Sequence, residues 1–203
     1  ELRADVLEIK TSSSTEQIEK INKQNITSEN TIIEWAQFYK VINSANAVIK
    51  YAPVVLTRDP LFTEEQMDQY IAEAKVVRSL AYFYLVRAFR EVPLITEPYL
   101  TDAQDIFQPK VAEEAILDRL ILDLKWSLKR VPVTYASAGS SLAWENKGRM
   151  TRWAAQTLLA DIYLWSEKYK ECVDACQLII DSKRYRLVGN EQEEEDENGK
   201  NGE

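Results

Sequence analysis

The sequence predicts an all-α protein in which long helices stack as antiparallel pairs. Only five glycines and six prolines occur in 203 residues, which favours long helices over a turn-rich β fold. Apolar residues recur at spacings of three and four along several stretches, as they do on one face of a helix. With 45% hydrophobic residues, the chain can also bury a sizeable core. We therefore expect one helical domain over residues 1–190, with at least five long helices.

A first long helix is expected at about residues 29–51. Ser28 can cap its start, and Pro53 should stop it. Trp35 and Asn46 lie along its apolar stripe, where a polar side chain needs an explanation. A hydrogen bond to another helix is the favoured interpretation of Asn46, because buried amides must be satisfied. A ligand contact is the alternative.

The stretch 64–90 is expected to be the central and most buried helix. Thr63 is a suitable N-cap, and Gln66 completes a capping box. Pro93 ends the helix because the residue before a proline is pushed out of the α region. Its apolar residues form two rows, so neighbours should cover it on two sides. One row holds Ile71, Ala74, Ala81 and Leu85, and the other holds Tyr70, Val77, Leu80 and Tyr84.

A long polar connection over residues 95–109 leads to a third long helix at about 111–130. Loops of this length are uncommon in compact domains unless they have a purpose. The third helix carries leucines and isoleucines at helical spacing on one face. A second loop over 133–147 follows it and contains Gly and Ser turn residues. The aromatic residues of the two loops include Tyr99, Phe107, Tyr135 and Trp144.

Residues 148–180 fit a helix pair of tetratricopeptide type. Its large–small pair, two aromatics and later small and apolar positions are matched by Leu159-Ala160, Tyr163, Tyr169, Cys172, Cys176 and Ile179. The first helix should end near Trp165, and the second should run over 169–180. Small side chains would let the two helices approach closely. The cysteines are expected to be buried free thiols, because helical geometry disfavours a disulfide at this spacing.

Composition argues against several classes of function. The chain has no histidine, which removes the commonest general base and metal ligand, and it shows no phosphate loop or nucleophile motif. Acid pairs such as Asp102 and Asp105 are better explained as solvated than as glycosidase carboxylates. The segment 191–203 carries −6 of the net charge of −8, so the body is nearly balanced and nothing indicates nucleic acid. This acidic tail is expected to be disordered.

Three segments, in order, resemble the SusD/RagB family of outer-membrane nutrient-binding lipoproteins. The first spans 73–94, with Glu73-Ala74, Arg78, Ala81-Tyr82-Phe83 and Val92-Pro93-Leu94. The second is Ile121-x-Asp123-Leu124, and the third runs from Gly148-Arg149-Met150-Thr151 to Leu158-Leu159-Ala160. The match departs at Arg90-Glu91, where the family usually has Gly-Asp.

The resemblance implies the N-terminal helical part of a protein of the outer membrane and cell surface. Such a protein binds a glycan or a peptide and partners a TonB-dependent, SusC-like transporter, without catalysis, cofactor or metal. Its contact with the membrane would be through a lipid anchor that is not present in this chain. In the family, a C-terminal half contributes much of the ligand site. The alternative function is a tetratricopeptide-type adaptor, which is less favoured because only one repeat is clear.

Exposed aromatics are the candidate ligand-binding residues, because a pyranose presents an apolar face to a ring. They are Tyr99, Phe107, Tyr135 and Trp144, although each could equally fold back onto the helices. The resemblance adds Arg3 and Asp5, ahead of the first long helix. Structural roles are expected for Trp35, Asn46, Glu73, Arg78, Asp123 and Gly148. Because Arg78 lies on an apolar face it needs an internal partner, with Asp123 placed ahead of Glu73 and Asp161.

Overall fold

The computed structural model describes residues 15–23, 25, 27, 34–101, 104–105, 107–136 and 144–185. The chain divides into two units, residues 1–40 and 41–203, and each is described by itself. The first unit holds the short helix α1 (Thr15–Asn22) and the first residues of α2 (Ala36–Leu56). The expected disordered tail, residues 191–203, lies outside the described residues.

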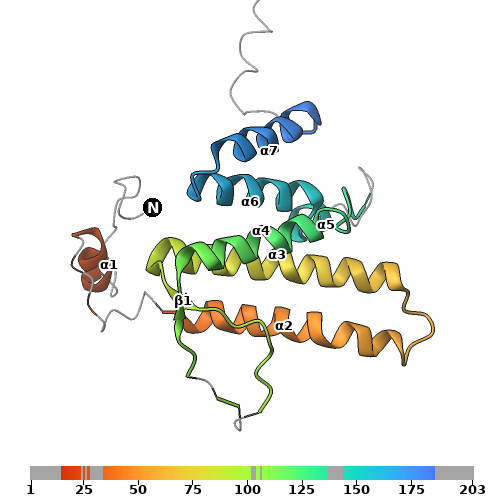
Figure 1. Cartoon of the computed structure of the whole chain (residues 1–203), viewed down its shortest axis with the longest axis horizontal. Coiled ribbons are helices and arrows are strands. Elements are labelled where there is room, and N and C mark those ends of the chain that lie inside the picture. The colour runs from red at the N-terminus through yellow and green to blue at the C-terminus, as the bar shows by residue number, and fades with distance from the viewer. Residues whose placement is uncertain are drawn as a thin grey trace, which may run out of the picture. The chain divides into compact units, whose positions relative to one another are not determined.

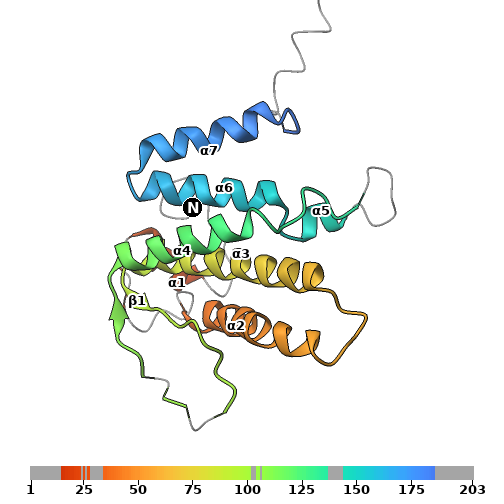
Figure 2. The same ribbon diagram turned by 45° about the vertical axis from the view of Figure 1, so that its right-hand side comes forward.

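The described part of the chain contains five long helices, which confirms the all-α prediction. After α2 come α3 (Glu64–Phe89), α4 (Glu113–Ser127), the short α5 (Glu145–Gly148), α6 (Arg152–Trp165) and α7 (Tyr169–Asp181). Within residues 41–203, α2, α3, α4, α6 and α7 follow one another as antiparallel neighbours (Figures 1 and 2). None of the described helices combines the length and the apolar character that crossing a membrane requires.

A pair of two-residue strands closes the connection between α3 and α4. Strand β1 (Val92–Pro93) pairs antiparallel with β2 (Lys110–Val111), with Val92 opposite Val111. The residues between the strands therefore form a loop whose two ends are held together. The sequence predicted the loop but not this pairing, because its partners are far apart in the chain.

The central helix α3 begins as predicted. Thr63 Oγ1 accepts a hydrogen bond from the backbone amide of Gln66 at 3.2 Å, and Gln66 Oε1 accepts one from the backbone amide of Thr63 at 2.9 Å. Eleven of its residues are buried, more than in the other described helices. The prediction that neighbours cover the second apolar row is wrong at both ends of the row, because Tyr70 and Tyr84 are 48% and 55% exposed. The covered faces of α3 are those that pack against α4 and α6.

Helix α2 differs from the prediction at both ends. It begins at Ala36, and the expected cap Ser28 lies outside the described residues. It also passes through Pro53 and continues to Leu56. A proline removes the hydrogen bond to the carbonyl four residues earlier, and in the last turn few further bonds depend on it. Ala52, just before the proline, is 7% exposed, so continuing the helix keeps this residue in the core.

The α6–α7 pair has the predicted boundaries, but its cysteines are not buried. Cys172 and Cys176 are free and only partly covered, because α7 buries Ala175 alone among its residues. Partial burial and the neighbouring Cys176 raise the pKa of the Cys172 thiol. The thiol therefore stays protonated near neutral pH, where a free cysteine is already mostly protonated.

A buried ionic cluster joins α3 to α4. Arg78 is 2% exposed, and its guanidinium donates to Asp123, the partner placed first by the sequence, which is 4% exposed. Lys75 and Arg119 also donate to the Asp123 carboxylate, at 3.1 Å and 3.3 Å. Burial alone would raise the pKa of Asp123, but the charges and hydrogen bonds of Arg78 and Lys75 hold it below its usual value. Asp123 is therefore a buried anion.

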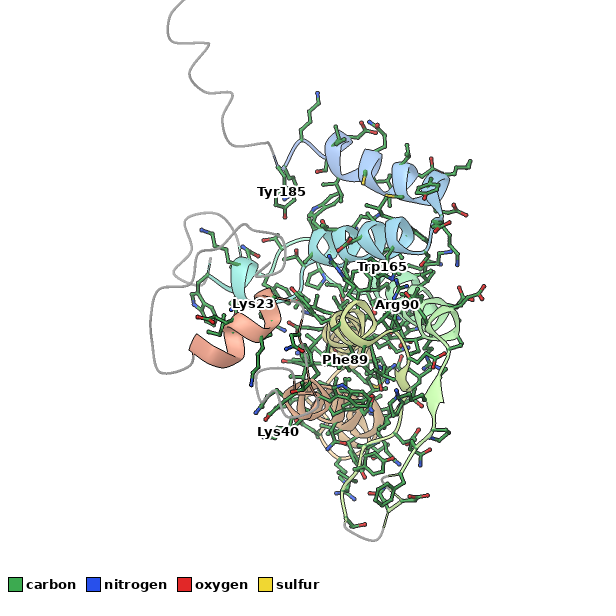
Figure 3. The ribbon with its side chains drawn as sticks, turned by 90° about the vertical axis from the view of Figure 1, so that its left-hand side faces the viewer. Lys23, Lys40, Phe89, Arg90, Trp165 and Tyr185 are labelled. Carbon is green, nitrogen blue, oxygen red and sulfur yellow. The ribbon has the colours of Figure 1, made fainter. Side chains whose placement is uncertain are left out.

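Arg90 ends α3 in a backbone conformation that glycine usually adopts. Its φ is 64°, which an L-residue adopts at a steric cost. This is the position at which the sequence departs from Gly-Asp. The Arg90 side chain donates to Glu113 at 2.9 Å and lies 5.6 Å from the centre of the Trp165 ring. Figure 3 shows Arg90 and Trp165 near each other at this end of the helices.

We expect Arg78→Ala to lower the free energy of unfolding by about 3–5 kcal/mol, because it leaves the Asp123 carboxylate buried with fewer partners. Urea denaturation would measure this loss. Arg87→Ala is the matched control, since the Arg87–Asp161 pair is about half-exposed on both sides and should contribute about 1 kcal/mol or less. An Arg78→Ala variant no less stable than Arg87→Ala would contradict the structural role of the buried pair.

The backbone cost at Arg90 can be isolated by comparing Arg90→Gly with Arg90→Ala. Both variants lose the contacts to Glu113 and Trp165, but only glycine adopts the positive φ without strain. Arg90→Gly should therefore be the more stable variant, by about 1–2 kcal/mol in denaturant unfolding. Equal stability of the two variants would show that the conformation carries no such cost.

Candidate ligand-binding pocket

Two asparagines of α2 fasten the first half of the 94–109 loop. Asn43 donates to the Tyr99 carbonyl at 3.0 Å and accepts from the Tyr99 amide at 2.6 Å. Asn46 donates to the carbonyls of Ile95 at 3.0 Å and Glu97 at 3.3 Å. Its side-chain oxygen accepts a hydrogen bond from the Arg78 guanidinium at 2.6 Å, which links α2 to α3. The backbone of the loop is thereby tied to the helical core.

A tyrosine of α3 holds the same segment from the other side. The Tyr82 hydroxyl donates to the Ile95 carbonyl at 2.9 Å and accepts from the Ile95 amide at 2.6 Å. Burial raises the pKa of Tyr82 to about 12, so the hydroxyl keeps the proton that it donates. The loop is also connected to the buried ion pair. Arg78 donates hydrogen bonds both to Asp123 and to Asn46, and Asn46 in turn donates one to the Ile95 carbonyl.

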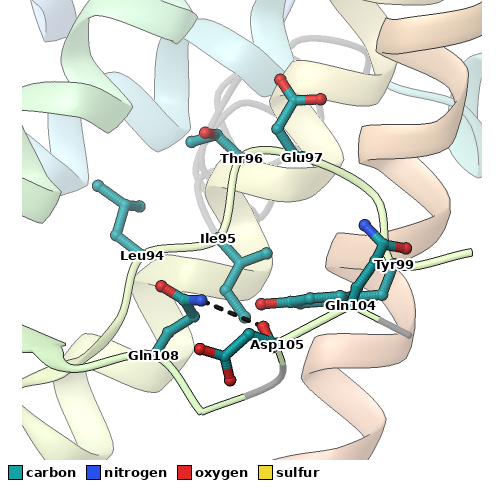
Figure 4. A pocket seen from close by; sticks show the side chains of 8 residues that line it. All are labelled: Leu94, Ile95, Thr96, Glu97, Tyr99, Gln104, Asp105 and Gln108. Carbon is teal, nitrogen blue, oxygen red and sulfur yellow. Dashed lines mark hydrogen bonds between the residues drawn. The ribbon is translucent and has the colours of Figure 1, made fainter. Parts of the chain in front are cut away.

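Residues of the loop line a cavity of about 440 Å³ that is open to solvent. Figure 4 shows its lining, in which the Tyr99 hydroxyl, the Asp105 carboxylate and the Gln108 amide lie near one another. The cavity combines one aromatic ring with several hydrogen-bonding groups. Its lining consists of Leu94, Ile95, Thr96, Glu97, Tyr99, Gln104, Asp105 and Gln108.

Side chains of the loop also fix its second half. Gln104 accepts from the amides of Leu100 and Thr101, at 2.6 Å and 3.2 Å. Asp105 accepts from the Phe107 amide at 2.9 Å through one carboxylate oxygen. An ionised carboxylate accepts about four hydrogen bonds in all, so Asp105 retains capacity for a ligand hydroxyl.

The structure brings only one of the predicted ligand-binding aromatics into this pocket. Tyr99 lines it, whereas Phe107 is 86% exposed and is not part of the lining. Tyr135 is part of the α4–α6 connection, where the Arg149 guanidinium lies 3.9 Å from the centre of its ring. Trp144, before α5, is 62% exposed and stands outside the pocket. Arg3 and Asp5 lie outside the described residues.

The other residues for which a structural role is expected are Glu73, Trp35 and Gly148. Glu73 binds the Arg149 guanidinium at 2.7 Å and 3.2 Å, fastening the start of α6 to α3. Trp35 lies 6.2 Å from Tyr39, ring centre to ring centre. A Cβ on Gly148 would meet the Trp144 ring at 3.7 Å, an ordinary contact, so the space there does not demand glycine.

Sequence reasoning missed Asn43, Gln104 and Gln108, which hold or line the pocket. Their signal was weak, because amides in a polar loop are common and only the fold shows which of them converge. Within the described residues, no group of three or more potential metal ligands comes together. The arrangement offers hydroxyl, amide and carboxylate groups beside a ring, which suits reversible binding of a polyhydroxylated molecule.

A family model described as starch-binding and associating with the outer membrane, SusD-like, matches residues 3–164. A SusD-like protein of Formosa agariphila is 26% identical over 178 residues, which cover 88% of this chain and 31% of that protein. A SusD-like protein of Bacteroides ovatus is 31% identical over 136 residues, which cover 67% of this chain and 22% of that protein. The chain thus spans about a third or less of these relatives.

Solved structures show the same relationship. A SusD superfamily protein from Bacteroides thetaiotaomicron is 26% identical and superposes with a TM-score of 0.77, covering 89% of this chain and 41% of that one. A laminarin-binding SusD-like protein is 27% identical, with a TM-score of 0.69, covering 82% of this chain and 34% of that one.

The clamp formed by Asn43 can be tested by hydrogen exchange. In Asn43→Ala, the Tyr99 amide loses its acceptor, so it should exchange at least about tenfold faster. Val48→Ala is the control, because Val48 lies on the same helix and is 42% exposed. Exchange at Tyr99 that is unchanged by Asn43→Ala would mean that the loop is held by other contacts.

Proposed function

This chain belongs to the SusD-like family, and on that basis we propose that it binds a glycan, without catalysis, in the pocket of the 94–109 loop. The pocket itself is the observation that carries the proposal. Sugar hydroxyls both donate and accept hydrogen bonds. The Asp105 carboxylate can accept them, and the side-chain amides of Gln104 and Gln108 each keep one N–H beyond those that donate to the carbonyls of Pro98 and Asp105. The Tyr99 ring provides an apolar surface for the face of a pyranose.

We also propose that the protein acts at the cell surface beside a TonB-dependent, SusC-like transporter, held at the membrane by a lipid anchor. The family model's description supports association with the outer membrane. A stripe of half-exposed apolar residues on α2 supports a large protein partner, since apolar patches mark interaction sites. The stripe consists of Val41, Val48, Tyr51 and Val55.

A tetratricopeptide-type adaptor remains the second candidate function. The outer face of α7 favours it, because Tyr169, Val173 and Ile180 share one side of that helix and are each more than 60% exposed. Such a stripe could receive an amphipathic helix or peptide. An adaptor of this kind would need no glycan pocket, so glycan binding separates the two functions.

The test is affinity electrophoresis of this chain in gels containing neutral polysaccharides such as laminarin. We expect weak retardation, with a dissociation constant on the order of 1 mM, because the pocket is open and relatives extend well beyond this chain. Tyr99→Ala should reduce binding about tenfold, since it removes the ring but not the backbone bonds to Asn43. Tyr169→Ala, which removes an exposed ring on α7, is the control and should bind as the unmodified chain does.

An equal loss of polysaccharide binding in Tyr99→Ala and Tyr169→Ala would contradict a glycan site in this pocket. So would the absence of retardation by any polysaccharide. Binding of a helical peptide that is lost in Tyr169→Ala would favour the adaptor. Tight stoichiometric binding would show that the site is complete within this chain and would contradict a ligand site shared with a further half.

A further inference from the structure

Beyond glycan binding, we propose that this pocket selects neutral polysaccharides and rejects sulfated or uronic-acid chains. The inference rests on the proposed function and concerns the charge of the ligand. The segment 94–109 contains three carboxylates, Glu97, Asp102 and Asp105, and no lysine or arginine. Two of these acids, Glu97 and Asp105, line the cavity.

The Glu97 carboxylate at the rim of the cavity is paired with a lysine of α2. Lys50 on α2 lies 2.9 Å from the Glu97 carboxylate, and this hydrogen bond raises the pKa of Lys50. The pair is close to neutral in sum, which leaves Asp105 as the uncompensated charge of the described lining. The Asp105 carboxylate accepts a hydrogen bond from the Phe107 backbone amide, which adds no positive charge to the lining.

The cations of the core are also committed elsewhere. Arg78 donates to Asp123 and to Asn46, and Lys75 and Arg119 donate to the same aspartate. None of these three side chains is among the residues that line the cavity. The polar network that anchors the loop therefore supplies rigidity to the pocket without supplying positive charge.

Charge then decides which glycan can enter. Proteins recognise sulfate and carboxylate groups chiefly with arginine and lysine, which the described lining lacks. A sulfate or uronate close to Asp105 would be repelled, whereas a neutral sugar hydroxyl can donate a charge-assisted hydrogen bond to the same carboxylate. We expect neutral chains to bind at least about tenfold more tightly than charged chains of the same backbone.

The experiment compares matched polymers on this chain: laminarin with laminarin sulfate, and dextran with dextran sulfate, by affinity electrophoresis at low salt. The neutral member of a pair should bind at least about tenfold more tightly, and the preference should shrink in high salt. Asp105→Asn should reduce the preference for the neutral over the sulfated polymer several-fold. Asparagine retains a side-chain oxygen that can accept from the Phe107 amide, but it loses the negative charge. Asp174→Asn, on the exposed side of α7, should leave the preference unchanged.

Equal or tighter binding of the sulfated polymers by the unmodified chain would overturn the charge selection while leaving glycan binding intact. A preference that Asp105→Asn does not alter would overturn the assignment to this pocket. Failure of both members of every pair to bind would overturn the proposed function, and the inference with it.

Discussion

The buried ion pair between Arg78 and Asp123 is the constraint on which the described helices depend. Charges removed from water are costly unless they are paired, so this contact fixes how α3 and α4 lie against each other. The same guanidinium donates to Asn46, which brings α2 into the same arrangement. One polar cluster thus sets the register of three helices that apolar packing alone would specify less strictly.

The loop that forms the candidate site is held in place by hydrogen bonds that lead to this cluster. The described residues of the 94–109 loop form no helix or strand, and the loop is held by Asn43 and Asn46 of α2, Tyr82 of α3 and the β1–β2 pair. Binding groups on a loop are useful when a rigid scaffold positions them. Here the scaffold contributes anchors, and the loop contributes the ring, amides and carboxylates that line the cavity.

Features set by nearby residues could be predicted from the sequence, and features set by distant partners could not. The Thr63 cap and the turn between α6 and α7 depend on neighbours in the chain, and the sequence placed both. Arg78 could be paired with Asp123 because a charge on an apolar face requires a partner. The pairing of Val92 with Val111 and the convergence of Gln104 and Gln108 on Tyr99 arise only when the chain folds.

The central claim is that a loop anchored on α2 and α3 forms the glycan site of this chain. The most direct measurement is a map of backbone amide chemical shifts during titration with a neutral oligosaccharide of the laminarin type. The account predicts that the shifted signals cluster at Tyr99, Gln104, Asp105 and Gln108, which line the pocket. Shifts concentrated on α7 or around Trp144, with the 94–108 signals unmoved, would contradict it.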